Sequence, residues 1–148
     1  MPEPANVASG PLSGMYNAYR QKLSTHIAMY GYTAFGKGSG TLTNLQQGIT
    51  FMLTLGDPET IMNGCLALQD ATFSVCNENS PAGYTIKKIM VGFGMEHHAV
   101  AVFPAGTIPS AGYVFDPWIT QSPQVYTYPE WLSGFTILNG IAEVRIEN

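Results

Sequence analysis

Two adjacent histidines open an apolar segment of this chain, and one of them is expected to face an aspartate. His97 and His98 begin the segment HHAVAVFP, and Asp116 lies near the end of the segment YVFDPW. An aspartate that faces a histidine can hold the imidazole in one tautomer and stabilise its charged form. These residues therefore predict either an orienting pair for nucleophilic catalysis or a structural His–Asp pair at a sheet edge.

The loop PAGTIPSAG between these two segments decides which histidine faces the aspartate. If the segments form a hairpin whose centre is Thr107, the residue opposite Asp116 is His98. Directly opposed residues of an antiparallel pair share a face, whereas the preceding residue points to the other face. We therefore expect His98 to meet Asp116, and His97 to turn toward solvent or a structural hydrogen bond.

A cysteine earlier in the chain could supply the nucleophile. Cys65 follows Asn63 and Gly64 and opens the run CLALQDATFSVC, which can be helical. A helix start and a nearby imidazolium favour the thiolate, and the backbone N–H groups there can donate to an oxyanion. Cys76 ends the same run, where the helix dipole opposes a thiolate, so we interpret it as a small buried apolar residue.

These three segments together resemble the signature elements of the papain-like and transglutaminase-like cysteine fold. The segments are NGC at a helix start, HHAVAVF, and YVFDPW, and the resemblance covers Asn63–Trp118. It implies that Cys65 is the nucleophile, that His98 is the general base and acid, and that Asp116 orients His98. Small domains of this type often act as toxins or secreted effectors, which the resemblance implies as a setting for this chain.

The chemistry expected from such a site is acyl transfer at an amide through a thioester. It would serve a peptidase, a glutamine deamidase or a transglutaminase, with a protein or peptide substrate and no cofactor. Around the triad, Gly64 would allow close approach of the substrate carbonyl, Asn63 could donate to the oxyanion, and Trp118 is expected near the substrate. A metal site is not expected, because adjacent strand residues diverge and no ligand spacing of the H-x-H type occurs.

The alternative hypothesis is a protein-binding module without catalysis. In that case His98 and Asp116 form a structural pair, and an aromatic-rich segment supplies the contact surface. Core packing is the more frequent role for most such side chains. The aromatic residues concerned are Tyr113, Trp118, Tyr126, Tyr128 and Trp131.

The pattern of apolar residues predicts helices first and strands second, hence an α+β fold. We expect residues 1–10 to be a loose terminus and the N-terminal helices to pack on an antiparallel sheet of about four strands. The helices are expected at 12–30, 45–55 and 61–75, the last beginning either there or at Cys65, with a short one near 129–133. The strands are expected at 84–93, 97–104, 113–118 and 141–146.

The length and charge of the chain limit its domain organisation and the classes of partner that it can bind. The chain has 148 residues, the size of a single domain. Charged residues make up 11% and the net charge is −4, so nucleic-acid binding has no electrostatic basis. Because no apolar run approaches a membrane span and no secretory signal is evident, we expect a soluble protein, either cytoplasmic or secreted without a recognisable signal peptide.

Overall fold

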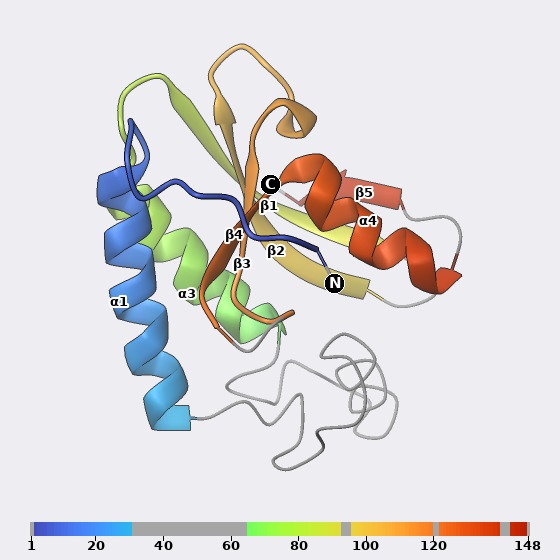
Figure 1. The fold of residues 1–148 in the computed structure, drawn as a ribbon, viewed down its shortest axis with the longest axis horizontal. Coiled ribbons are helices and arrows are strands. Elements are labelled where there is room, and N and C mark those ends of the chain that lie inside the picture. Colours follow the sequence, from blue (N-terminus) through green and yellow to red (C-terminus); the bar gives the residue numbers. More distant parts are fainter. Residues whose placement is uncertain (1, 31–64, 93–95, 120–121, 140–142, 148) are drawn as a thin grey trace.

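A five-stranded antiparallel sheet with helices on both sides forms the fold (Figure 1). The computed structural model describes residues 2–30, 65–92, 96–119, 122–139 and 143–147. In chain order the elements are α1 (Ser13–Tyr30), α3 (Cys65–Glu78), β1 (Tyr84–Gly92), β2 (Glu96–Pro104), the 3-10 helix η3 (Pro109–Ala111), β3 (Tyr113–Asp116), β4 (Gln124–Thr127), α4 (Tyr128–Asn139) and β5 (Glu143–Ile146). The predicted α+β class is confirmed.

The strand order is β4-β3-β2-β1-β5, so the last strand of the chain returns to lie beside the first. β2 is central, and β1 and β2 pair along their whole length from Tyr84 opposite Pro104 to Gly92 opposite Glu96. β4 is an additional strand that the sequence did not predict. The strand has only four residues and lies between Pro123 and Pro129, and it is recognised as a strand by its pairing with β3.

Helices cover both faces of the sheet: α1 and α3 lie on one side and α4 lies on the other (Figure 1). On one side, Tyr19 of α1 packs edge-on against Phe115 at 4.9 Å between ring centroids, and α3 packs beside α1. On the other side, Trp131 of α4 reaches Asp116. We refer to these sides as the α3 face and the α4 face.

Large apolar side chains fill the core on both faces. Burying each of them stabilises the fold by about 1.5–3 kcal/mol. The largest fully buried ones are Trp118, Trp131, Tyr19, Tyr126, Phe115, Phe135, Met15, Leu23, Leu68, Ile89 and Ile119.

The predicted elements are mostly found, with changed bounds. Helices at 13–30 and from Cys65 onward are present, and the helix expected near 129–133 extends over the whole of α4. The helix expected at 45–55, and the possible start of α3 at 61–64, lie outside the described residues. None of the helices in the described ranges is long and apolar enough to cross a membrane.

The predicted register of the β2–β3 hairpin is wrong by one residue. Val100 pairs with Phe115 and Val102 pairs with Tyr113, so the hairpin centre lies between Thr107 and Ile108 instead of at Thr107. The loop is asymmetric because its second half is wound into η3, which a symmetric turn does not allow for. Since side chains alternate along a strand, a one-residue shift exchanges the two faces.

Gly112 makes this asymmetric loop possible, because it lies against the backbone of β2. A Cβ at this position would overlap the carbonyl oxygen of Val102 and come within 2.6 Å of the Cα of Phe103. The Gly112 carbonyl also accepts a hydrogen bond of 3.1 Å from the backbone N–H of Tyr128, where α4 begins. One glycine therefore joins the hairpin loop to the start of α4.

We predict that Gly112→Ala lowers the free energy of unfolding by about 2–3 kcal/mol, because the new methyl group meets backbone that cannot move aside. Gly14→Ala is the matched control, since nothing lies within 4 Å of a Cβ there and the position is helical. It should leave stability unchanged or raise it by up to about 1 kcal/mol. Urea denaturation of both variants is the measurement, and equal stabilities would contradict the close approach at Gly112.

Candidate functional site

The two adjacent histidines have different carboxylate partners on opposite faces of the sheet. His97 contacts Asp116 on the α4 face, with 2.6 Å between Nε2 and Oδ2. His98 contacts Glu147 on the α3 face, with 3.1 Å between Nδ1 and Oε1. The expected contact between His98 and Asp116 is therefore wrong, because the shifted register puts Asp116 opposite Ala99 and diagonal to His97.

The His97–Asp116 pair is fully enclosed. The two side chains are 1% and 0% exposed. Asp116 also accepts hydrogen bonds from the Trp131 indole N–H at 2.8 Å and from the Trp118 backbone N–H at 3.0 Å. A buried carboxylate needs this number of donors, because each missing one leaves desolvated charge uncompensated.

Aromatic rings surround the imidazole of His97. The ring of Phe135 stacks on it at 5.2 Å between centroids, and the ring of Trp118 packs at 4.8 Å. This cluster joins β2, β3 and α4 around one hydrogen-bonded His–Asp pair, and its described side chains leave no surface open to a substrate. We interpret the His97–Asp116 pair as structural.

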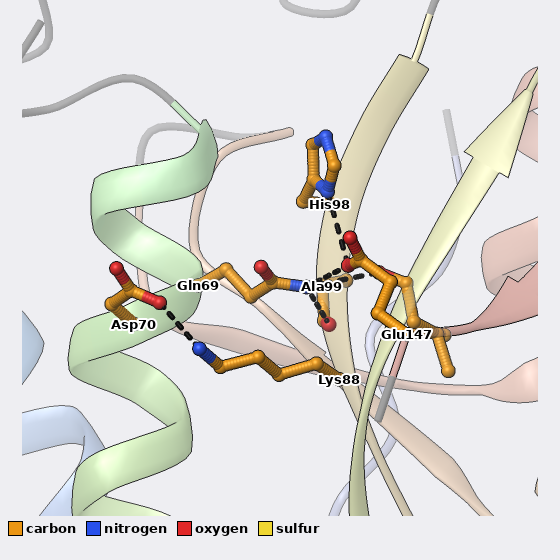
Figure 2. Close-up of polar contacts among 7 residues, drawn as sticks. Gln69, Asp70, Lys88, His98, Ala99 and Glu147 are labelled. Atoms are coloured by element: carbon orange, nitrogen blue, oxygen red, sulfur yellow. Dashed lines mark hydrogen bonds and ion pairs between the residues drawn. The ribbon is translucent and has the colours of Figure 1, made fainter. Parts of the chain in front are cut away.

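The His98–Glu147 pair is more accessible. The side chain of His98 is 9% exposed and that of Glu147 is 31% exposed. Glu147 directly follows β5, and its backbone N–H donates to the carbonyl of Lys88 at 2.9 Å, so it continues the pairing of β5 with β1. His98 lies opposite Met90 of β1, and the sheet thus brings the carboxylate to the imidazole from two strands away (Figure 2).

Gln69 of α3 meets the same carboxylate. Its side-chain nitrogen lies 2.8 Å from Oε1 of Glu147, and it also donates to the carbonyl oxygens of Ile89 at 3.0 Å and of Ala99 at 2.9 Å. Gln69 is only 3% exposed. Figure 2 shows its side chain crossing from the helix to the sheet, where it joins α3 to both central strands and to the partner of His98.

The first residue of α3 is Cys65, one helical turn before Gln69. Figure 1 shows that α3 begins at the end of the sheet where β2 also begins, which is the end that carries His98. The Cys65 side chain, together with Asn63 and Gly64, lies outside the described residues. The helix start and the histidine that the sequence predicted to cooperate therefore belong to the same face and the same end of the sheet.

The second cysteine has the role that the sequence predicted. Cys76 is fully buried in the hydrophobic core, and burial raises the pKa of its thiol well above the usual range. A thiol that remains protonated is a poor nucleophile and a poor metal ligand. Among the described residues, no group of three or more His, Cys, Asp or Glu side chains converges as a metal site would require.

The aromatic contact surface of the alternative hypothesis is largely inside the protein. Trp118, Tyr126 and Trp131 are at most 1% exposed, whereas Tyr113 and Tyr128 are partly buried. Trp118, expected near the substrate, packs on His97 on the α4 face, away from His98. Core packing, the more frequent role for such side chains, is confirmed for these three.

Sequence reasoning missed Glu147 and Gln69. The segment EVRIE alternates as a strand does, but nothing in it marks Glu147 as the partner of a histidine that is 49 positions earlier. The signal that could have raised Gln69 is its position: residues four apart share a helix face, so Gln69 shares the face of Cys65.

No protein-family model matches this chain, and no curated protein or solved structure matches it either. The papain-like core that the three signature segments predict therefore stays a prediction.

We predict that the two carboxylates contribute very differently to stability. Asp116→Ala should lower the free energy of unfolding by about 3–5 kcal/mol, because it leaves His97 and two N–H donors buried without their acceptor. The matched truncation Glu147→Ala should cost less than about 1 kcal/mol, since that side chain is partly exposed. Chemical denaturation followed by tryptophan fluorescence measures both, and similar losses would reject the structural assignment of the buried pair.

Proposed function

We propose that the protein is a cysteine-dependent enzyme that transfers the acyl group of an amide, with Cys65 as nucleophile, His98 as general base and acid, and Glu147 as the residue that orients His98. The observation that carries this proposal is the His98–Glu147 pair on the face of the helix that begins at Cys65. The proposal keeps the predicted nucleophile and base, and it replaces Asp116 by Glu147.

The two ring nitrogens of His98 have different surroundings, and this chemistry requires such a difference. Nδ1 is held by Glu147, and in Figure 2 the second ring nitrogen points away from that carboxylate. With Nδ1 donating to Glu147, Nε2 is the nitrogen that can accept the thiol proton. The carboxylate stabilises the imidazolium that forms.

The start of a helix suits the nucleophile. The first backbone N–H groups of α3 have no acceptor within the helix, and the positive end of the helix dipole favours a thiolate. The same N–H groups can donate to the oxyanion of the tetrahedral intermediate. Asn63 and Gly64, which precede this turn, stay predicted oxyanion and substrate-binding residues.

The reaction balances with these groups alone. The Cys65 thiolate attacks the amide carbonyl carbon, and the tetrahedral intermediate collapses as the imidazolium of His98 gives its proton to the leaving nitrogen. The C–N bond breaks, ammonia or an amine leaves, and a thioester remains. Water or an acceptor amine, deprotonated by His98, then attacks the thioester and releases the thiol.

The choice of His98 over His97 rests on face and exposure. His97 lies on the face opposite to α3 and is enclosed by aromatic rings, so it could reach neither the start of α3 nor a substrate without repacking the core. His98 lies on the same face as α3, and its side chain is 9% exposed. The choice among peptidase, glutamine deamidase and transglutaminase, and the toxin or effector setting that the family resemblance implies, remain predictions.

Alkylation of the two cysteine thiols tests the proposed site directly. At pH near 6, iodoacetamide should alkylate Cys65 and leave Cys76 unmodified, because a buried, protonated thiol does not react. His98→Ala should slow the alkylation of Cys65 about tenfold or more, since the thiolate loses its imidazolium partner. Peptide mass spectrometry locates the modified cysteine.

His97→Ala provides the comparison in the same experiment. Provided that circular dichroism shows a folded protein, this variant should keep the alkylation rate of Cys65 within about twofold of wild type, in line with a structural His97. Loss of Cys65 reactivity in folded His97→Ala, with His98→Ala unaffected, would transfer the role to the buried pair and reject our assignment.

Turnover separates the possible reactions. With a glutamine-rich protein as substrate, we expect either ammonia release or chain cleavage, abolished in Cys65→Ala and unchanged in Cys76→Ala. His98→Ala should lower the rate about a hundredfold or more, which is the usual contribution of a positioned general base. Ammonia assay and gel electrophoresis are the measurements. Cleavage without ammonia release would identify a peptidase. If a broad panel of proteins yields neither ammonia nor cleavage products, the binding module is favoured.

A further inference from the structure

We infer that Gln69 is a positioning residue that holds Glu147, and through it the imidazole of His98, in register with the start of α3. Its catalytic meaning rests on the proposed function, but the link from Gln69 to His98 is a property of the fold. Nothing in the sequence motifs predicts this role.

The orientation of the Gln69 amide is determined by its neighbours. All three groups around its nitrogen are acceptors: two backbone carbonyls and a carboxylate oxygen. Carbonyl and carboxylate oxygens cannot donate, so the NH₂ end of the amide must face them and the amide cannot be reversed. The two amide hydrogens are therefore shared among three acceptors.

The three acceptors are the ones that define the geometry of His98. Ala99 directly follows His98 in β2, and Ile89 is the ladder partner of Ala99 in β1. Glu147 holds the ring itself. One buried amide thus contacts the carboxylate that orients the His98 ring and the backbone carbonyl of the residue that follows His98.

The amide also connects these groups to the nucleophile. Gln69 lies four residues after Cys65, about 6 Å along the helix axis at 1.5 Å per residue. The amide therefore ties the start of α3 directly to the His98–Glu147 pair. Hydrogen bonds depend on direction, whereas apolar contacts do not. A hydrogen-bonded amide therefore fixes the relative position of two groups better than apolar contact does, and proton transfer requires such defined geometry.

A second polar contact between α3 and the sheet serves as a natural control. Asp70, the next residue of α3, pairs with Lys88 of β1 at 2.6 Å, and the two side chains are 69% and 28% exposed. This ion pair joins the same helix to the same sheet, but it involves neither Glu147 nor His98 (Figure 2). Asp70→Asn should therefore weaken docking of α3 without disturbing the histidine.

The experiment is a double-mutant cycle on the full chain, with the alkylation rate of Cys65 by iodoacetamide at pH 6 as the measured quantity. We expect Glu147→Ala to slow it about tenfold and Gln69→Met, which keeps the side-chain volume, about threefold to tenfold. The double variant should be no slower than Glu147→Ala alone, because Gln69 acts through Glu147. Asp70→Asn should match wild type.

A spectroscopic readout tests the same link without reference to reactivity. The ¹⁵N shifts of the His98 ring report which nitrogen carries the proton, and the contact with Glu147 favours the Nδ1–H tautomer. Gln69→Met should lower the population of that tautomer, whereas Asp70→Asn should not. Gln69→Leu provides a second variant if Gln69→Met does not fold, which we do not expect because Ile89 and Ala99 stay paired in the ladder.

The outcomes separate the two proposals. Rate losses that multiply in the double variant, or an unchanged tautomer in both Gln69 variants, would show that Gln69 only packs α3 onto the sheet, and this inference would be wrong. If wild-type Cys65 reacts no faster than Cys76, the proposed function fails, while the tautomer measurement still decides whether Gln69 positions His98.

Discussion

The alternation of side chains along β2 is the constraint on which the rest of the structure depends. His97 and His98 are neighbours in the chain, so they must point to opposite faces of the central strand. Each face then supplies its own carboxylate: Asp116 from β3 on the α4 face and Glu147 beyond β5 on the α3 face. Two adjacent residues of one type thus acquire different environments without any difference in local sequence.

The two environments suit different tasks because their exposure differs. On the α4 face the His97–Asp116 pair is enclosed by aromatic rings, and the N–H donors around Asp116 help to offset the cost of burying the carboxylate. Such a pair holds β2, β3 and α4 in a single arrangement. On the α3 face the carboxylate keeps contact with water, and the imidazole lies near the beginning of a helix. This is the access that the proposed proton transfer by His98 requires, and Gln69 contacts the carboxylate that holds His98.

The order of strands explains why this second site was difficult to foresee. β5 comes from the end of the chain and pairs with β1. This pairing brings Glu147, which directly follows β5, toward β2 in the middle of the sheet. Gln69 approaches from a helix much earlier in the chain. Contacts between such distant segments have no periodicity or spacing that a sequence displays, whereas the segment from Cys65 to Asp116 does display an ordered set of chemical residue types.

The amino-acid sequence by itself determined the types of element and the residues capable of chemistry. Apolar spacing specifies α1 and α3, β-branched runs specify β1 and β2, and local composition places Cys65 at a helix start and both histidines at a strand start. The tertiary structure alone decided which carboxylate each histidine meets. The reason is physical: the η3 turn and the close approach at Gly112 shift the hairpin by one residue, and in a strand a shift of one residue exchanges one face of the sheet for the other.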